Sequence, residues 1–239
     1  MDIPFSADAF NVPPYRSVNE TSSCPQSLAR GFIVSLVSAA LFGAIADAVF
    51  RSAWMLPWDA RIGSWFHSFQ SRTVTHAMVL VSLFGDPRLL FVSSLGLAGV
   101  LLYLSFWREL FTAGVILAGG AVLHLILKSA FHRARPDGDW LTAVQGYSFP
   151  SGHALGAVLF YGTLAYLGTR LCGMPRDHPV RRYLFVSVCA GVVFWVGVSR
   201  VYLGVHFLSD VLGGWSAGAF WLSLSLTAVH RLRPRPCPM

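Results

Sequence analysis

Six long apolar stretches separated by polar segments dominate the hydrophobic pattern of this chain. Each has roughly 16 to 20 residues and almost no charge, against the about 20 that a helix needs to cross a bilayer. They run Gly31–Phe50, Leu89–Phe106, Leu110–Leu127, Ala154–Thr169, Tyr183–Val198 and about Val211–Val229. The fourth and fifth are slightly short and must include flanking residues. Helices of a soluble protein have a polar face, whereas these stretches are apolar nearly all round. The pattern predicts an all-α, polytopic membrane protein with a six-transmembrane-helix bundle.

The longest polar connection, Arg51–Arg88, has a different pattern. It interleaves polar residues with aromatic ones, namely Trp54, Trp58, Trp65, Phe66 and Phe69. Aromatic side chains concentrate at the level of the lipid headgroups, so we expect part of this loop to lie along the interface between spans 1 and 2. Thr75–Leu83 is too short to span and stops at the turn signal Gly85-Asp86-Pro87. It is either an interfacial helix or an extra turn ahead of the second span.

The domain organisation predicted from this pattern is a single membrane domain over residues 31–229. Residues 1–30 contain prolines, acidic residues and a Ser/Thr cluster, so they are predicted to be a polar N-terminal tail and not a signal peptide. Residues 230–239 form a short basic C-terminal tail.

Composition supports the membrane interpretation. Hydrophobic residues make up 54% of the 239 residues and charged residues 12%, about half the level of soluble domains, and the mean hydropathy is +0.57. The formal charge of +7 raises the question of nucleic-acid binding. The arginines bracket apolar runs instead of lining one polar stripe, which argues against that class.

The basic residues also indicate topology. With six spans both termini share one side, which carries ten of the 18 lysines and arginines, and the other side carries eight. Three of those eight, Lys128, Arg135 and Arg200, have a chemical reason to be where they are, as argued below. When these three residues are left out, the side that carries the termini has clearly more basic residues than the other. The positive-inside rule then places the termini in the cytoplasm.

Three polar clusters stand at span ends on the predicted non-cytoplasmic side. The first runs from Lys128 to Arg135-Pro136, where a spacing of seven residues places both cations on one helix face and proline then ends the helix. The second is Ser148-Phe-Pro-Ser-Gly-His153, directly ahead of the fourth span. The third is Ser199-Arg200, five residues, His206, three residues, Asp210.

The third cluster supplies a nucleophile. His206 and Asp210 are four residues apart, so on a helix their side chains are neighbours. A carboxylate that holds one ring N–H of a histidine fixes the tautomer and leaves the other nitrogen free to attack. His206 is therefore a candidate for covalent catalysis, and Asp210 for its orientation.

The remaining cluster residues suit a phosphoryl group. Three cations, Lys128, Arg135 and Arg200, match its three non-bridging oxygens. Ser151 and Gly152 add a hydroxyl and the free N–H groups of a helix N-terminus. His153 beside them could protonate the departing alcohol oxygen.

Other polar residues near the spans have simpler interpretations. Basic residues at span ends are commonly interfacial anchors, to which we assign Arg51, Arg88, Arg108, Arg133 and Arg170. Histidines taken as interface residues are His67, His76, His132, His178 and His230. We expect His124 to hydrogen-bond a neighbouring helix, and Asp47 to face the bundle with a hydrogen-bonding partner. The four cysteines, Cys24, Cys172, Cys189 and Cys237, lack metal-ligand or disulfide spacing.

The motifs resemble those of the type-2 phosphatidic acid phosphatase superfamily, whose relatives include bacterial undecaprenyl-diphosphatases and phosphatidylglycerophosphatases. The family pattern of Lys, six residues, Arg-Pro, then Pro-Ser-Gly-His, then Ser-Arg, five residues, His, three residues, Asp is present without departure. The resemblance implies that His206 becomes phosphorylated, that Asp210 orients it and that His153 acts as acid and then base. It implies that phosphate is bound by Lys128, Arg135, Ser151, Gly152 and Arg200. It also implies catalysis without a metal or other cofactor.

The sequence therefore predicts an integral membrane phosphatase that hydrolyses a lipid phosphate monoester or diphosphate. Its expected partners are that substrate and membrane lipids, with no nucleic acid and no obligate protein partner. A bacterial inner-membrane location with a periplasmic or extracellular active site is expected. A lipid-to-lipid phosphotransferase using the same site remains an alternative. An anion or lipid transporter would use the cations but gives no reason for a His–Asp pair and a second histidine.

Overall fold

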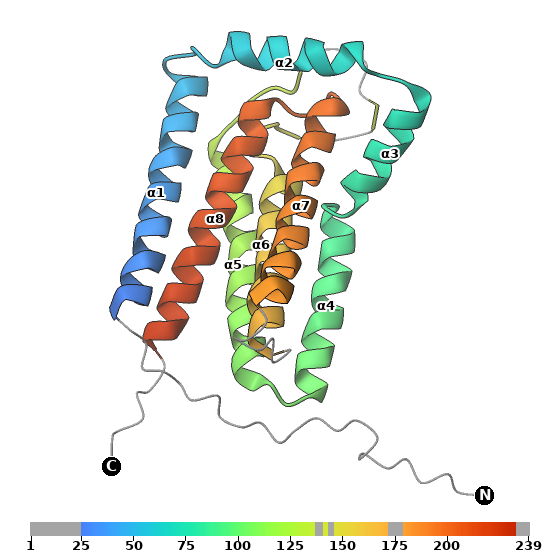
Figure 1. The fold of residues 1–239 in the computed structure, drawn as a ribbon. Helices are drawn as coiled ribbons and strands as arrows, with labels where there is room; N and C mark the ends of the chain where they lie inside the picture. Colours follow the sequence, from blue (N-terminus) through green and yellow to red (C-terminus); the bar gives the residue numbers. More distant parts are fainter. Residues whose placement is uncertain (1–24, 137–140, 143–145, 172–178, 233–239) are drawn as a thin grey trace, which may run out of the picture.

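The computed structural model describes residues 25–136, 141–142, 146–171 and 179–232, and over these ranges it contains eight helices and no strand (Figure 1). The helices are α1 (Pro25–Phe50), α2 (Leu56–Ser68), α3 (Arg72–Leu83), α4 (Pro87–Tyr103), α5 (Trp107–Ala130), α6 (Gly152–Leu171), α7 (Pro179–Tyr202) and α8 (Leu208–Arg231). The predicted all-α class is confirmed for the described part of the chain.

The long helices form a bundle in which α8 packs against α1, α5 and α6, and α6 also packs against α7 (Figure 1). The centre of the bundle is apolar and contains Ile116, Leu155, Leu159 and Ala217. Small residues on α8 let neighbouring backbones approach closely, which is the usual way of packing helices in membranes. At Gly214 a β-carbon would lie 2.6 Å from the carbonyl oxygen of Ser151, so only glycine fits there.

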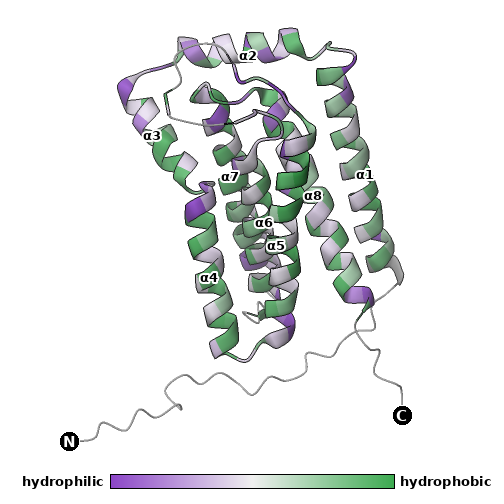
Figure 2. Ribbon diagram, turned by 180° about the vertical axis from the view of Figure 1, so that it is seen from behind, coloured by the Kyte–Doolittle hydropathy of each residue, from purple (hydrophilic) through white to green (hydrophobic). Residues whose placement is uncertain are grey.

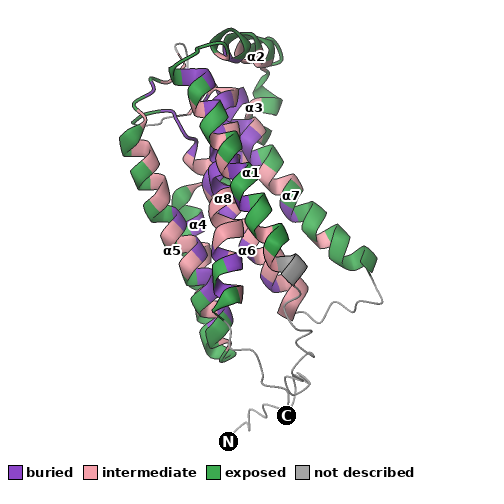
Figure 3. Cartoon of the chain, turned by 90° about the vertical axis from the view of Figure 1, so that its left-hand side faces the viewer, coloured by how far each residue is buried: buried purple, intermediate pink, exposed green. Residues whose placement is uncertain are grey.

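The outside of the bundle is apolar, as expected for a protein solvated by lipid. Figure 2 shows hydrophobic residues along the lengths of the helices, and Figure 3 shows that many outward-facing residues are exposed. Leu125 on α5 is 68% exposed and Phe91 on α4 is 63% exposed. Contiguous apolar surface on this scale is rare on soluble monomers. The chain is thus an integral membrane protein.

Four helical segments are long and apolar enough to cross a membrane: Leu28–Phe50, Trp107–Ala130, Gly152–Leu171 and Pro179–Tyr202. The pair α3 and α4, bent by 41°, qualifies as a fifth when the two are taken as one broken span. The sixth predicted stretch lies in α8, which is not among these candidates. The number of six spans therefore remains a prediction.

The segment ahead of the second span is a separate helix. The α3 helix ends at Leu83, and α4 begins at Pro87 after the predicted turn. The side chain of Asp86 caps α4 by accepting hydrogen bonds from the backbone N–H groups of Arg88 at 2.8 Å and Leu89 at 3.2 Å. The turn signal is thus correct, and the bend comes from capping together with a proline in the first turn.

The α2 helix lies across one end of the bundle, over α7 and α8 (Figure 1). Its aromatic residues Trp58 and Trp65 are 54% and 57% exposed, whereas its Asp59 is buried. This crosswise placement agrees with the expected interfacial segment between the first two spans.

The predicted tails fall largely outside the described residues. Residues 1–24 and 233–239 are not described, and α1 begins at Pro25, six residues before the predicted start of the span. The α8 helix continues to Arg231, so the predicted C-terminal boundary at residue 230 lies inside its last turn.

Candidate active site

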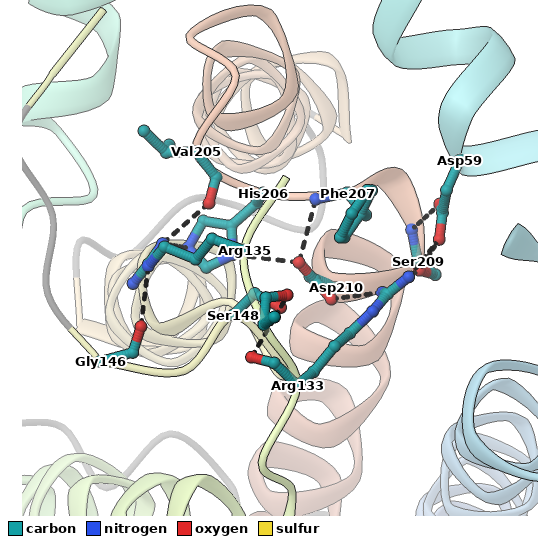
Figure 4. A network of polar contacts seen from close by, with 11 residues as sticks. Asp59, Arg133, Arg135, Gly146, Ser148, Val205, His206, Phe207, Ser209 and Asp210 are labelled. Atoms are coloured by element: carbon teal, nitrogen blue, oxygen red, sulfur yellow. Dashed lines mark hydrogen bonds and ion pairs between the residues drawn. The ribbon is translucent and has the colours of Figure 1, made fainter. Parts of the chain in front are cut away.

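The three predicted clusters meet at the end of the bundle that α2 crosses (Figures 1 and 4). Lys128 lies in the last turn of α5, which ends at Ala130. Arg135 therefore lies in the irregular segment that follows and not on a helix face shared with Lys128, so the expectation that Pro136 ends the helix is wrong. Charge interactions still link Lys128 to Arg135, Arg200 and Asp210.

His206 and Asp210 are neighbours, although only Asp210 is helical. The α7 helix ends at Tyr202, Gly204 has a φ of +71° that turns the chain, and His206 precedes the first residue of α8. Asp210 lies in the first turn of α8, where its Oδ2 accepts a hydrogen bond of 2.9 Å from the N–H of Phe207. The same oxygen lies 3.3 Å from Nδ1 of His206. Helix capping and the His–Asp contact thus share one carboxylate.

The second ring nitrogen of His206 faces Arg135. Nη1 of Arg135 lies 3.4 Å from His206 Nε2, and its guanidinium is held by the carbonyl oxygens of Val205 at 2.8 Å and Gly146 at 2.9 Å (Figure 4). An arginine nitrogen can only donate, so a ring lone pair must point toward it. This places the proton of His206 on Nδ1, toward Asp210, and leaves Nε2 free beside a cation.

The environment keeps His206 neutral. Burial lowers the pKa of His206 to about 4, and the nearby Arg135 and Arg200 act in the same direction against the opposing effect of Asp210. Burial likewise lowers the pKa of Arg135, although this guanidinium stays charged at neutral pH. A neutral imidazole next to a fixed cation is the state that a nucleophile toward an anion requires.

Two buried donors in the same place lack a partner in the described structure. They are the hydroxyl of Ser151 and Nε of Arg200, whose Nη1 donates to Ser82 at 2.6 Å. A buried donor without a partner costs about 1–3 kcal/mol, which a bound anion would offset. Ser151 is fixed by its own N–H, which donates to the carbonyl oxygen of Asp210 at 2.9 Å.

His153 and Gly152 begin α6 at this site. His153 interacts electrostatically with Arg200, His206, Lys128 and Arg135. A β-carbon at Gly152 would lie 2.9 Å from the ring of His124, so this histidine lines the start of α6. Nδ1 of His124 is buried without a partner among the described residues, so the hydrogen bond predicted for His124 is not made by this nitrogen.

Arg133 is not an interfacial anchor, contrary to the expectation from its place at a span end. It is buried, with Nη2 donating to Asp59 Oδ2 at 2.8 Å and Nη1 to Asp210 Oδ1 at 2.7 Å (Figure 4). Its guanidinium also lies 4.1 Å from the centre of the Phe207 ring. Asp59 and Ser209 complete this network, and the sequence reasoning missed both. The only signal in the sequence was a carboxylate among the aromatic residues of the 51–88 segment.

Two further predictions need correction. Asp47 does not face the bundle: its side chain is 50% exposed, lies 3.7 Å from Arg51 and accepts a hydrogen bond from Ser52. The expected hydrogen bond is therefore present, but at the helix end and facing outward. Arg170, also assigned as an anchor, pairs with the buried Glu109 at 3.4 Å.

Metal ligands are not grouped anywhere in the described residues, where no set of three or more His, Cys, Asp and Glu side chains could hold an ion. Among the cysteines, Cys189 is buried as a free thiol, while Cys24, Cys172 and Cys237 lie outside the described ranges.

Fold and site together define an integral membrane protein in which a buried histidine–carboxylate pair lies beside basic side chains. The sequence pattern of the PAP2 superfamily matches residues 109–234, more than half of the chain. The chain therefore belongs to the PAP2 superfamily.

Relatives in this family include lipid phosphatases. The chain is 37% identical to phosphatidylglycerophosphatase B of Bacillus subtilis (strain 168) over 121 residues, which are 51% of this chain and 58% of that protein. It is 33% identical to a lipid A 1-phosphatase of Rhizobium johnstonii over 201 residues, which are 73% and 74% of the two chains.

Solved structures share the fold. The crystal structure of a transmembrane PAP2-type phosphatidylglycerolphosphate phosphatase from Bacillus subtilis has a TM-score of 0.70 at 25% identity, and the match covers 85% of this chain and 97% of that one. The structure of Aquifex aeolicus LpxE has a TM-score of 0.56 at 21% identity, with 70% and 93% covered, and this likeness concerns the fold alone.

Proposed function

We propose that this protein is an integral membrane phosphatase that hydrolyses a phosphate monoester or diphosphate of a lipid through a phosphohistidine at His206. Membership of the PAP2 superfamily and its lipid phosphatase relatives support the class of reaction. The observation that carries the mechanism is the placement of the two ring nitrogens of His206. Nδ1 lies 3.3 Å from Asp210 and Nε2 lies 3.4 Å from Arg135.

The first step is attack on phosphorus. Arg135, Arg200 and Lys128 hold the phosphate oxygens, and the lone pair on Nε2 of His206 forms the N–P bond. The P–O bond to the lipid alcohol breaks, and His153 donates a proton to the departing oxygen. Asp210 stabilises the positive charge that develops on the ring.

The second step reverses these roles. His153, now neutral, removes a proton from water, the resulting hydroxide attacks phosphorus, and the N–P bond breaks. Inorganic phosphate leaves and His206 returns to its starting state. Every proton is accounted for by these side chains and water, so the proposed reaction runs without a metal ion or other cofactor.

The substrate class follows from the relatives. They are named for phosphatidylglycerophosphate and for the 1-phosphate of lipid A, so a phosphorylated membrane lipid is the proposed substrate. We further propose that α8 completes a six-span bundle, that both termini are cytoplasmic and that the site faces the periplasm or the outside of the cell. The lipid tails would then stay in the bilayer while the headgroup reaches the cationic pocket.

The test is phosphate release by the purified protein from phosphatidylglycerophosphate, phosphatidic acid, undecaprenyl diphosphate and lipid A phosphates. Replacement of the nucleophile, His206→Ala, should abolish release, whereas His67→Ala on the exposed surface of α2 should stay within about twofold of the wild type. A 32P label should be trapped on His206 under acid-free quenching. Full release by His206→Ala from every lipid would refute the mechanism.

Inhibition supplies an independent check. Vanadate adopts the five-coordinate geometry of the transition state and should inhibit strongly, since transition-state analogues bind about 10²-fold or more tighter than substrates. Chelators should leave the rate unchanged. Transfer of labelled phosphate to a second lipid in preference to water would instead identify a phosphotransferase.

A further inference from the structure

A buried chain of ion pairs connects α2 to the proposed nucleophile (Figure 4). Asp59 on α2 accepts a hydrogen bond of 2.8 Å from Arg133, and the other terminal nitrogen of Arg133 donates to Asp210 Oδ1 at 2.7 Å. The second oxygen of Asp210 faces Nδ1 of His206. Only two side chains therefore separate Asp59 from the ring of His206.

Ser209 provides a second connection. Its backbone N–H donates to Asp59 Oδ1 at 3.0 Å, and its hydroxyl donates to Asp59 Oδ2. Nη1 of Arg133 donates to the same hydroxyl at 2.6 Å. Asp59 thus satisfies a free N–H in the first turn of α8, where a carboxylate is favoured by the helix dipole. A side chain of α2 holds the turn that carries Asp210.

Stability alone is a weak explanation of this network. Asp59 is 3% exposed and Arg133 is 8% exposed, and the desolvation of buried ions offsets most of the gain from pairing them. Two carboxylates sharing one guanidinium give a fixed geometry, because the planar fork bonds both at once. The contacts converge on Asp210, the carboxylate that orients His206.

The arrangement also controls charge. Asp210 alone would favour a protonated His206 and so remove the free lone pair. Arg133 neutralises part of the charge of Asp210 on the side away from the ring. Asp59 binds the other terminal nitrogen of Arg133 and so holds the guanidinium between the two carboxylates.

We infer that Asp59 is a positioning residue for the His206–Asp210 pair and acts through Arg133 and Ser209, an inference that rests on the proposed phosphatase function. The α2 helix thereby becomes part of the catalytic apparatus, although none of its side chains is required to touch the phosphate.

The first experiment measures steady-state phosphate release by full-length Asp59→Asn. Misplacement of the nucleophile should lower kcat on the order of 10²-fold. KM and the inhibition constant of inorganic phosphate should stay within about twofold, because the cations that bind phosphate are untouched. The matched control is Glu109→Gln, which removes a buried partner of Arg170 at the opposite end of the bundle and should leave kcat within about twofold.

The second experiment is the pH profile of kcat/KM. Arg133→Gln exposes His206 to the full charge of Asp210, so the acid limb should move to higher pH. Asp59→Asn leaves Arg133 in place and should not move it upward. The other charged or titratable groups that act on His206, namely Arg135, Arg200 and His153, are the same in both variants.

The outcomes separate this inference from the proposed function. If the wild type releases no phosphate, the function fails; if only His206→Ala is inactive and Asp59→Asn is fully active, the positioning role fails alone. Equal losses of kcat in Asp59→Asn and Glu109→Gln, with parallel losses of melting temperature, would reduce the network to a structural role. If Asp59→Asn does not fold, Ser209→Ala is the second variant, because it keeps both ion pairs. It should lower kcat several-fold with KM unchanged. A kcat of Ser209→Ala equal to that of the wild type would overturn the inference.

Discussion

His206, the proposed nucleophile, has to meet two requirements that oppose each other in water. Its ring must be neutral, so that one nitrogen keeps a lone pair, and a positive charge must lie nearby to attract an anionic substrate. Burial disfavours the protonated ring, and Arg135 supplies the charge 3.4 Å from Nε2 without protonating it. The pKa of His206 consequently falls from 6.5 to about 4.

This lowered pKa predicts the acid limb of the reaction. In the proposed mechanism the active form of His206 is neutral, so the limb that it causes in kcat/KM should lie near pH 4, well below that of an exposed histidine. The measurement is kcat/KM from about pH 3 to pH 8 on two lipid phosphates whose own second pKa values differ. A limb that follows the substrate belongs to the substrate. A limb near pH 6.5 that is common to both substrates would contradict the prediction.

Local patterns in the sequence identified the residues that we propose to act on the phosphate. Spacing and chemistry indicated His206, Asp210 and the three cations, and in the structure these side chains interact electrostatically with one another. Arg133 could not be assigned in this way. Its partner Asp59 lies 74 positions earlier in the chain, and only the crosswise placement of α2 makes the two meet.

The contact between α6 and α8 fixes how two parts of the site lie relative to each other. Ser151, just before α6, donates its N–H to the carbonyl oxygen of Asp210 in α8, at 2.9 Å. Gly214, one turn further along α8, permits this approach because it has no β-carbon. The cluster that contains Ser151 and the cluster that contains Asp210 are therefore placed relative to each other by one close helix contact.

Substitution of Gly214 by alanine should separate these two clusters. Its β-carbon would meet the Ser151 carbonyl oxygen at 2.6 Å and the Ala154 β-carbon at 3.0 Å, so α8 must shift. We expect a loss of about 1–3 kcal/mol in stability and a lower kcat. The measurements are thermal unfolding in detergent and phosphate release. Gly43→Ala on α1, where a β-carbon meets nothing within 4 Å, is the control and should be neutral or slightly stabilising. Equal behaviour of the two variants would disprove the packing argument.

Hydrophobic periodicity predicted the helices better than their ends. The turn at Gly85-Asp86-Pro87 was recognised because proline and a capping carboxylate act locally. The end of α5 was placed too late, at Pro136 instead of Ala130. The residues after Ala130 leave the helix for contacts that no local rule contains, such as the Arg133–Asp210 pair.

The molecule has two different ends. One carries α2 and the site, and at the other α1 begins and α8 ends (Figure 1). In the proposed function, a phosphorylated headgroup enters the site from the membrane face at which α2 lies. The distribution of basic residues predicts that this is the non-cytoplasmic face. The two ends are therefore distinguishable by chemical labelling in intact cells.

Single cysteines introduced at each end test the orientation. The variants are made in a chain whose four native cysteines are replaced, and a membrane-impermeant maleimide is added to intact bacterial cells with a permeable outer membrane. Ser64→Cys, on the exposed surface of α2, should react under these conditions. Ser105→Cys lies in the turn between α4 and α5, at the opposite end. It should react only after the inner membrane is opened, because the proposed topology places one crossing, α3 with α4, between the two positions. Retained phosphate release verifies that each variant is folded. Labelling of Ser105→Cys alone in intact cells would place the site in the cytoplasm, and a phosphatase there would act on lipids before their export instead of after it.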